Sequence, residues 1–298
     1  MQHTLTQNDL VEVMYLGNGA HRVINRYDYD MCRPGSNLQC LASTRLYPRY
    51  SSLLTTASTG NSSYNALVAR FDHRLSAGFN GRFEYTLAKA IGDSSEGNDS
   101  QISSCRSCEK TAAAFDARHR AVVSLIYDLP FGRGRRFGAQ MSRLVDAGAG
   151  GWTITTIGTF QTGAAFQVTA PSQTVSPYYS QRPNRLCDGS SSSLAGNLRG
   201  NGMKQFDTSC FALPASSFFG NAGRNILYAP GVNNWDIGLQ KYFVATERLK
   251  FQFRGELFNG LNHAQFGQPN ASFGSASFGL ITSAASPRLV QLGLRMLF

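Results

Sequence analysis

The chain has 298 residues, of which 42% are hydrophobic and only 15% charged, fewer than the roughly 25% of a typical soluble domain. Its net charge is +10, but the arginines are scattered over predicted strands and turns, so we expect no nucleic-acid partner. It contains no apolar run of roughly 18 residues, which excludes transmembrane helices but not membrane-spanning strands, whose hydropathy signal is weak.

Eight segments of the chain alternate apolar and polar side chains, as strands do when one face meets an apolar phase and the other meets water. Each segment has about ten residues, the length of a tilted strand that crosses a bilayer. In chain order they are residues 9–18, 64–74, 79–90, 118–129, 152–162, 235–243, 249–259 and 289–298. The pattern predicts an all-β fold of about eight antiparallel transmembrane strands.

The connections between these segments alternate in length. Long polar connections are expected at 19–63, 91–116, 163–231 and 260–286, and shorter ones at 75–78, 130–150 and 245–248. Membrane barrels alternate in this way because one rim carries long external loops and the other carries short periplasmic turns. We therefore expect an outer-membrane barrel, with outer-membrane lipid as its surroundings. The alternative is a soluble antiparallel sheet with one solvated face.

The polar faces of the predicted strands carry charged side chains at mid-strand, where a wet lumen tolerates them and a protein core does not. The candidates for lumen-facing charges are Arg70, Arg82, Glu84, Arg254 and Glu256. They either line a permeation path that favours anionic solutes or pair with one another and with a plug domain.

The last segment, residues 289–298, shows the clearest alternation. Its apolar face carries Val290, Leu292, Leu294, Met296 and Phe298, and its polar face carries Gln291, Gly293 and Arg295. Aromatic residues near strand ends are expected at the membrane interface. Those on outward faces are Trp152, Trp235 and Tyr127, whereas the parity of Tyr242 turns it inward.

The six cysteines fall into three pairs, and each pair lies within one long connection. The disulfide candidates are Cys32 with Cys40, Cys105 with Cys108, and Cys187 with Cys210. External loops are oxidising surroundings in which disulfides persist. The alternative for Cys105 and Cys108 is half of a zinc site or a redox motif, but the chain has no second CxxC.

Two further motifs invite a chemical interpretation that the sequence does not support. Asp116 and His119 could act in acid–base chemistry, but neither a nucleophile nor a metal is indicated nearby. The GRGRRFG segment at 132–138 has the wrong spacing for a dinucleotide fingerprint, and a glycine-rich turn with solvated arginines explains it better. We therefore predict no catalytic, cofactor-binding or metal site, and no enzyme.

Several short motifs occur in one order along the chain. They are YNAL at 64–67, FEYTLAKA at 83–90, FDARHR at 115–120, LPFGRG at 129–134, GGW at 150–152, FGNAGRN at 219–225, ELFN at 256–259, LNH at 261–263 and PRLVQLGLR at 287–295. In this order they resemble the C-terminal barrel of TonB-dependent outer-membrane receptors. The nearest branch is Oar-like, whose chains usually begin with a carboxypeptidase-regulatory-like domain.

The resemblance implies a barrel of about 22 strands closed around a plug, with a TonB box that engages the TonB–ExbB–ExbD complex of the inner membrane. Residues 1–298 would then be one partial barrel domain: the signal peptide, the plug and more than half of the strands are missing. We expect a fragment or truncated product whose first strand is an unpaired edge, which lipid does not tolerate. The resemblance also implies that the barrel-assembly machinery recognises the terminal strand and Phe298.

The expected function is that of the C-terminal barrel segment of such a receptor, which takes up a bulky nutrient that is siderophore-, saccharide- or peptide-like. One alternative is a surface or adhesion protein in which the disulfide-stapled loops bind a partner. Another is a self-contained eight-stranded barrel. The sequence does not name the substrate.

Overall fold

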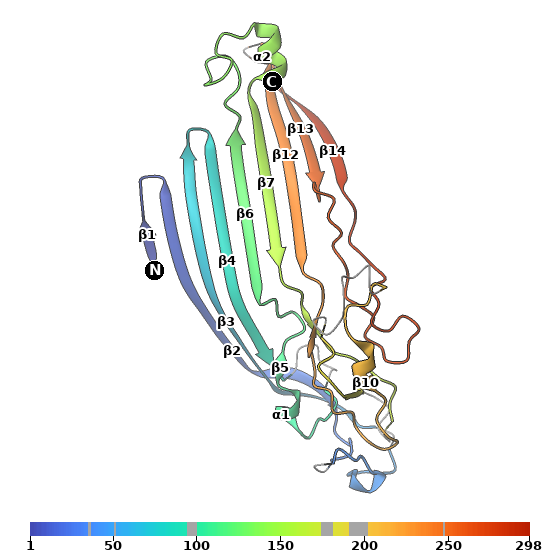
Figure 1. The fold of residues 1–298 in the computed structure, drawn as a ribbon. Coiled ribbons are helices and arrows are strands. Elements are labelled where there is room, and N and C mark those ends of the chain that lie inside the picture. Colours follow the sequence, from blue (N-terminus) through green and yellow to red (C-terminus); the bar gives the residue numbers. More distant parts are fainter. Residues whose placement is uncertain (35–36, 51, 94–99, 174–180, 191–201, 247) are drawn as a thin grey trace.

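A computed structural model describes residues 1–34, 37–50, 52–93, 100–173, 181–190, 202–246 and 248–298. Eight long strands form one curved antiparallel sheet (Figure 1). They are β2 (Asp9–Asp28), β3 (Leu54–Ser76), β4 (Phe79–Gly92), β6 (His119–Asp128), β7 (Trp152–Gln161), β12 (Val232–Val244), β13 (Lys250–Phe258) and β14 (Leu289–Leu297). Each predicted segment coincides with one of these strands, and the all-β antiparallel fold is confirmed.

The sheet has two edges. Its order is β1, β2, β3, β4, β6, β7, β12, β13 and β14, with β5 (Thr111–Ala112) paired to the end of β4. Since β1 and β14 stand at opposite ends of this order, the sheet is open, which counts against a self-contained eight-stranded barrel. The expectation that the first strand is wholly unpaired is wrong at its start, because β1 (Gln2–Thr4) pairs with residues 10–12 of β2.

The first long connection is much shorter than predicted. Residues 19–28 continue β2 and residues 54–63 continue β3, so the predicted loop at 19–63 is wrong in its bounds and the connection covers 29–53. The two extensions pair with each other along their length, with a register shift beside Arg22, whose φ is +57°. The longest strands of the sheet therefore project beyond the segments whose alternation marks the membrane.

Long and short connections lie at opposite ends of the sheet (Figure 1). The long ones hold short elements: η1 (Ala42–Thr44), α1 (Arg106–Glu109), β8 (Ala165–Phe166), β9 (Asn184–Arg185), η3 (Thr208–Cys210), β10 (Phe211–Ala212) and β11 (Leu227–Tyr228). At the other end, the turn predicted at 130–150 contains a helix that the pattern did not predict, α2 (Arg143–Ala149). No helix in the described ranges has the length and apolar character to cross a membrane.

The turn between β3 and β4 shows why the short connections can be so tight. Ser76 pairs with Phe79, and the two central residues, Ala77 and Gly78, both have positive φ, +50° and +82°. A two-residue turn with two positive φ angles matches the twist of the flanking strands, and the register shifts once between Ser76 and His73 before the regular pairing continues.

The sheet has no apolar core of its own. Large apolar side chains on one of its faces are exposed, among them Leu67, Phe71, Phe83 and Leu292. The hydrophobic clusters that the described residues form lie instead in the long connections. A soluble sheet would bury such a face, so the exposed apolar face is one that lipid covers.

Candidate functional site

The four long connections pack together into one structure at the end of the sheet, which we call the loop cap: the described parts of residues 29–53, 93–118, 162–231 and 259–288. One buried cluster joins the first three connections through Met31, Ile102 and Phe219. A second joins the third and fourth, with the ring of Phe206 5.3 Å from the ring of Phe278. The cap is therefore a packed unit and not a set of separate loops.

Three disulfides staple the loop cap. The structure joins Cys32 to Cys40, Cys105 to Cys108, and Cys187 to Cys210, which are the pairs expected from the sequence. Cys32 and Cys40 belong to the first buried cluster and Cys210 to the second. The thiols of Cys105 and Cys108 are bonded to each other, so they are not presented as zinc ligands.

A buried ion pair ties two connections of the cap together. The Arg182 guanidinium donates two hydrogen bonds to the Glu109 carboxylate, at 2.7 and 3.0 Å, and both side chains are almost fully buried. The same carboxylate accepts the backbone N–H groups of Gln101 and Ile102 at 3.0 and 2.9 Å. A buried charge needs this degree of pairing to be tolerated, so this junction fixes the second connection against the third.

Two aspartates of the cap are held in their charged form. Hydrogen bonds from the hydroxyl and backbone N–H of Ser190 lower the pKa of Asp188. In the same way, the hydroxyl and backbone N–H of Ser209 lower the pKa of Asp207, whose carboxylate thereby caps η3 next to Cys210. Both carboxylates stabilise local turns of the third connection.

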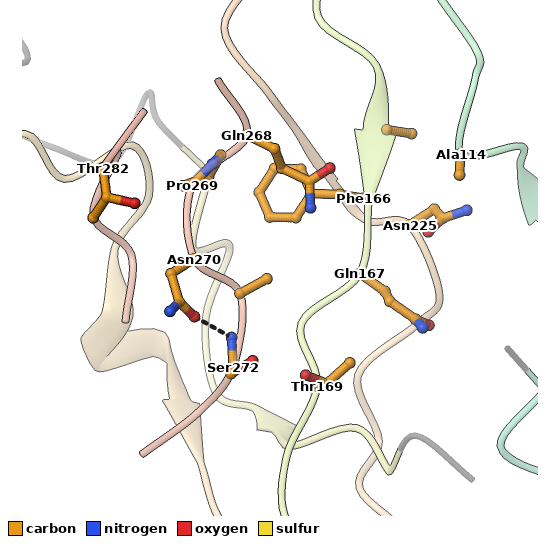
Figure 2. Close-up of a pocket in the computed structure, with 12 residues that line it drawn as sticks. Ala114, Phe166, Gln167, Thr169, Asn225, Gln268, Pro269, Asn270, Ser272 and Thr282 are labelled. Carbon is orange, nitrogen blue, oxygen red and sulfur yellow. Dashed lines mark hydrogen bonds between the residues drawn. The ribbon is translucent and has the colours of Figure 1, made fainter. Parts of the chain in front are cut away.

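The cap contains a pocket of about 470 Å³ between its third and fourth connections. Figure 2 shows Phe166, Gln167 and Thr169 on one segment of the lining and Gln268, Asn270 and Ser272 on another. Its wall consists of Ala114, Ala165, Phe166, Gln167, Thr169, Asn225, Gln268, Pro269, Asn270, Ala271, Ser272 and Thr282. Sequence reasoning missed this site, because its residues come from segments up to 168 positions apart (282 − 114) and carry no local motif.

The chemistry of the pocket is neutral. Amides and hydroxyls provide its polar atoms, Phe166 and Pro269 provide apolar surface, and none of its lining residues is charged. Asn270 Oδ1 accepts the backbone N–H of Ser272 at 2.8 Å, whereas Gln167 Oε1 is buried with no hydrogen-bond partner. A buried carbonyl oxygen without a partner is costly, and a hydroxyl or amide group that displaced its neighbours to reach it would remove that cost.

The predicted lumen-facing charges are all engaged in ion pairs on the polar face of the sheet. Arg70 contacts Glu84 at 2.8 Å and Glu12 at 3.1 Å. Arg82 pairs with Asp72, and Arg254 contacts Glu256 at 2.5 Å. Partly exposed pairs of this kind contribute about 0–1 kcal/mol each. The pairs of Arg70 and Arg82 join neighbouring strands, whereas Arg254 and Glu256 lie on the same strand, β13. The structure brings the five candidates into three pairs and not into one site.

The two residues of the predicted acid–base motif do not act together. Asp116 is buried and accepts the backbone N–H of Ala90 at 2.6 Å. His119 Nδ1 instead lies 2.7 Å from the hydroxyl of Tyr85. Each side chain therefore fixes one strand to a neighbouring segment.

The apolar face of the sheet carries aromatic pairs at two levels. Trp235 packs edge-to-face with Phe160, and Trp152 packs edge-to-face with Phe253. In the register of β7 and β12, Trp152 lies opposite Lys241, six positions from Trp235 (241 − 235), or about 20 Å along the strand. Aromatic girdles flank a membrane band of about 25 Å, so the two levels fit the two interfaces.

The remaining aromatic and terminal-strand residues lie on the faces of the sheet that the sequence pattern assigned to them. Tyr127 packs against Phe79 near the short-turn end, whereas the hydroxyl of Tyr242, on the opposite face, accepts a hydrogen bond from Gln252. The five apolar side chains of the terminal segment are all exposed: Val290, Leu292, Leu294, Met296 and Phe298.

An open antiparallel sheet with an exposed apolar face and segregated loops is the wall of a membrane barrel, and the comparison with protein families agrees. The profile described as outer membrane beta barrel domain matches residues 1–291. This chain belongs to the outer membrane beta-barrel domain family. The predicted location in the outer membrane is thereby confirmed, and the family is one of membrane barrels and not a class of enzymes.

Two further comparisons, with curated proteins and with solved structures, concern the fold of this outer membrane beta-barrel domain. No curated protein matches the chain. Among solved structures, the outer membrane transporter YddB from Escherichia coli is similar over 99% of this chain, with a TM-score of 0.51 and 11% sequence identity. The chain spans 31% of that transporter's length, and at this identity the likeness establishes architecture only.

Proposed function

We propose that this chain forms part of the wall and part of the external surface of a TonB-dependent outer-membrane receptor that takes up a bulky nutrient. Three observations support the proposal: the outer membrane barrel family, the transporter-like fold, and a pocket inside a stapled cap at the long-loop end. The TonB–ExbB–ExbD complex would supply energy through a plug and TonB box that lie outside residues 1–298.

The pocket carries the argument about substrate. A siderophore–iron complex is often charged and is matched by basic residues, whereas this lining offers amides, hydroxyls and the ring of Phe166. Neutral hydrogen-bonding groups beside an apolar surface suit a saccharide or a neutral peptide. We therefore propose a saccharide- or peptide-like nutrient that is bound by the amides of this lining, among them Gln167, whose side-chain oxygen lacks a partner.

Uptake in the native host tests the proposal. Deleting the gene should abolish growth on at least one oligosaccharide or oligopeptide of a defined panel, and deleting TonB should have the same effect. Q167A should slow uptake of that nutrient about tenfold, roughly the worth of one or two hydrogen bonds, because it removes a ligand contact without breaking a protein contact. The matched control is Q140A, an exposed glutamine in the turn at the opposite end of the sheet. Unchanged growth of the gene deletion on the whole panel would reject transport.

One observation favours a second function, surface adhesion: the cap has its own hydrophobic clusters and three disulfides, as a durable external binding surface needs. The two functions predict different phenotypes for the same gene deletion. Loss of attachment to a surface or matrix with normal nutrient uptake would favour adhesion. Loss of uptake that also requires TonB would favour the receptor.

The proposed role of the terminal strand in assembly is tested separately. Removing Phe298 should lower the amount of heat-modifiable, folded protein in the outer membrane, whereas Phe298→Tyr should retain it because the ring stays in place. Phe298 is almost fully exposed, so its loss removes no packing contact within the chain. Equal assembly of the truncated and unaltered proteins would argue against recognition of this residue by the barrel-assembly machinery.

A further inference from the structure

The connection between β6 and β7 concentrates basic charge at the short-turn end of the sheet. Residues 130–150 contain one acidic residue, Asp146, against four arginines, and all four are exposed: Arg133, Arg135, Arg136 and Arg143. No ion pair within the described ranges engages any of these guanidinium groups. Neither the fold nor the proposed uptake explains this cluster.

Arg133, Arg135 and Arg136 lie on a compact turn, residues 131–138, which we call the arginine turn, and Arg143 is the first residue of α2. The backbone N–H of Gly132 donates to the carbonyl of Phe137 at 2.9 Å, and the rings of Phe131 and Phe137 lie 5.5 Å apart. The guanidinium of Arg136 lies over the Phe137 ring at 5.5 Å. The turn is also fixed to α2, because the backbone N–H of Arg133 donates to Asp146 Oδ1 at 2.7 Å. These contacts preorganise the charged side chains on one small unit.

Helix α2 anchors this unit on the lipid-facing side of the sheet. Trp152 Nε1 donates to the Gly148 carbonyl at 2.8 Å, and Lys241 Nζ donates to the Asp146 carbonyl at 3.0 Å. Trp152 and Lys241 are paired positions on the apolar face of β7 and β12. Helix α2 meets the sheet through this carboxyl-terminal part, while Leu144 and Val145 on its first turn remain 89% and 53% exposed.

The position of the arginine turn along the strands corresponds to the headgroup level of one bilayer leaflet. The aromatic pair of Trp152 and Phe253 marks the interface at the short-turn end, which in membrane barrels is the periplasmic one. The arginine turn follows directly beyond that level, where phospholipid phosphates lie. Arginine binds phosphate through paired N–H donors, and exposed apolar side chains beside basic ones are typical of segments that lie in the headgroup region.

We propose that the arginine turn and α2 form a binding site for anionic phospholipid in the periplasmic leaflet. The four guanidinium groups contact the headgroup phosphates, and Leu144 and Val145 enter the acyl boundary. The occupant is a phospholipid such as phosphatidylglycerol, since the phosphates of the external leaflet face the loop cap at the far end of the strands. The site holds this rim of the wall at a fixed depth.

The two tryptophans of the chain make the test specific, because Trp152 reports the short-turn interface and Trp235 the opposite one. The protein is reconstituted into phosphatidylcholine vesicles containing a tenth of phosphatidylglycerol, with bromine on the acyl chains of one lipid at a time. In W235F, brominated phosphatidylglycerol should quench Trp152 several-fold more than the same mole fraction of brominated phosphatidylcholine. In W152F, the two brominated lipids should quench Trp235 equally.

Removing the charges should remove this preference. Each arginine near an anionic surface favours association by about fivefold, so R136Q alone should raise about fivefold the fraction of brominated phosphatidylglycerol that gives half-maximal quenching of Trp152. In R135Q/R136Q/R143Q the two brominated lipids should quench Trp152 equally. The matched control, R33Q/R49Q, removes exposed arginines from the loop cap and should leave the preference intact. Equal quenching of Trp152 by the two lipids, or a preference that survives the triple substitution, would overturn the proposal. Both readouts are independent of nutrient uptake.

Discussion

Replacing Glu109 by alanine should loosen the loop cap at the junction between its second and third connections. The carboxylate accepts four hydrogen bonds of 3.0 Å or shorter, two from Arg182 and two from backbone N–H groups. E109A would leave the guanidinium buried without its counter-charge and the two N–H groups without acceptors. Breaking a buried pair in this way costs about 3–5 kcal/mol.

Hydrogen–deuterium exchange measured by mass spectrometry reports this cost locally. The backbone amides of Gln101 and Ile102, which bond the carboxylate directly, should exchange at least a hundredfold faster in E109A, since about 1.4 kcal/mol corresponds to a factor of ten. The matched control is E256A, which breaks the partly exposed pair with Arg254 and should cost less than about 1 kcal/mol. A change below fivefold at Gln101 and Ile102 would refute the view that this junction holds two connections of the cap together.

Three further predictions concern the cap and the wall. C187S/C210S should destabilise the third connection by about 3 kcal/mol, because the bridge closes a loop with a sequence separation of 23; thermal unfolding with and without reductant would measure it. Gly158→Val should lower the stability of the wall by about 1–3 kcal/mol in urea titrations in detergent, because its new Cβ would meet the overlying indole at 2.9 Å. Because Ser209 lowers the pKa of Asp207, its carboxylate should stabilise η3 fully above the ordinary value of 3.8. The protection of the Cys210 amide, measured against an unstructured peptide at the same pH, should fall as pH drops below 3.8, and D207N should remove that fall.

The sequence was a good guide wherever one face of a strand meets lipid. Alternation located all eight wall strands, six of them within three residues at both ends, because lipid imposes a period of two on the side chains. It failed for residues 19–28 and 54–63, where β2 and β3 rise beyond the membrane. Serine, threonine and asparagine make up seven of the ten residues 54–63, so small polar side chains stand on both sides of β3 and leave no apolar–polar period in the sequence.

The cap was less predictable for a different reason. Cysteine spacing within each connection suggested the disulfide partners, since both members of a pair lie close in sequence. By contrast, Glu109 and Arg182 are 73 positions apart (182 − 109), and nothing local to either residue indicates the other. The lining of the pocket has the same origin in long-range packing. Helix α2 had one local signal, Ser142 before the helix, whose side chain accepts the Val145 N–H, but seven residues are too few for a helical period to show.

The separation of the buried clusters from the sheet has a consequence for how this surface can evolve. Because the cap holds its own apolar interior and covalent staples, residues on its outer side can be exchanged without altering the register of the wall. The sequence of the wall, in turn, is constrained by the thickness of the lipid bilayer and by pairing between strands. One half of this chain can therefore vary while the other half keeps the protein in the membrane.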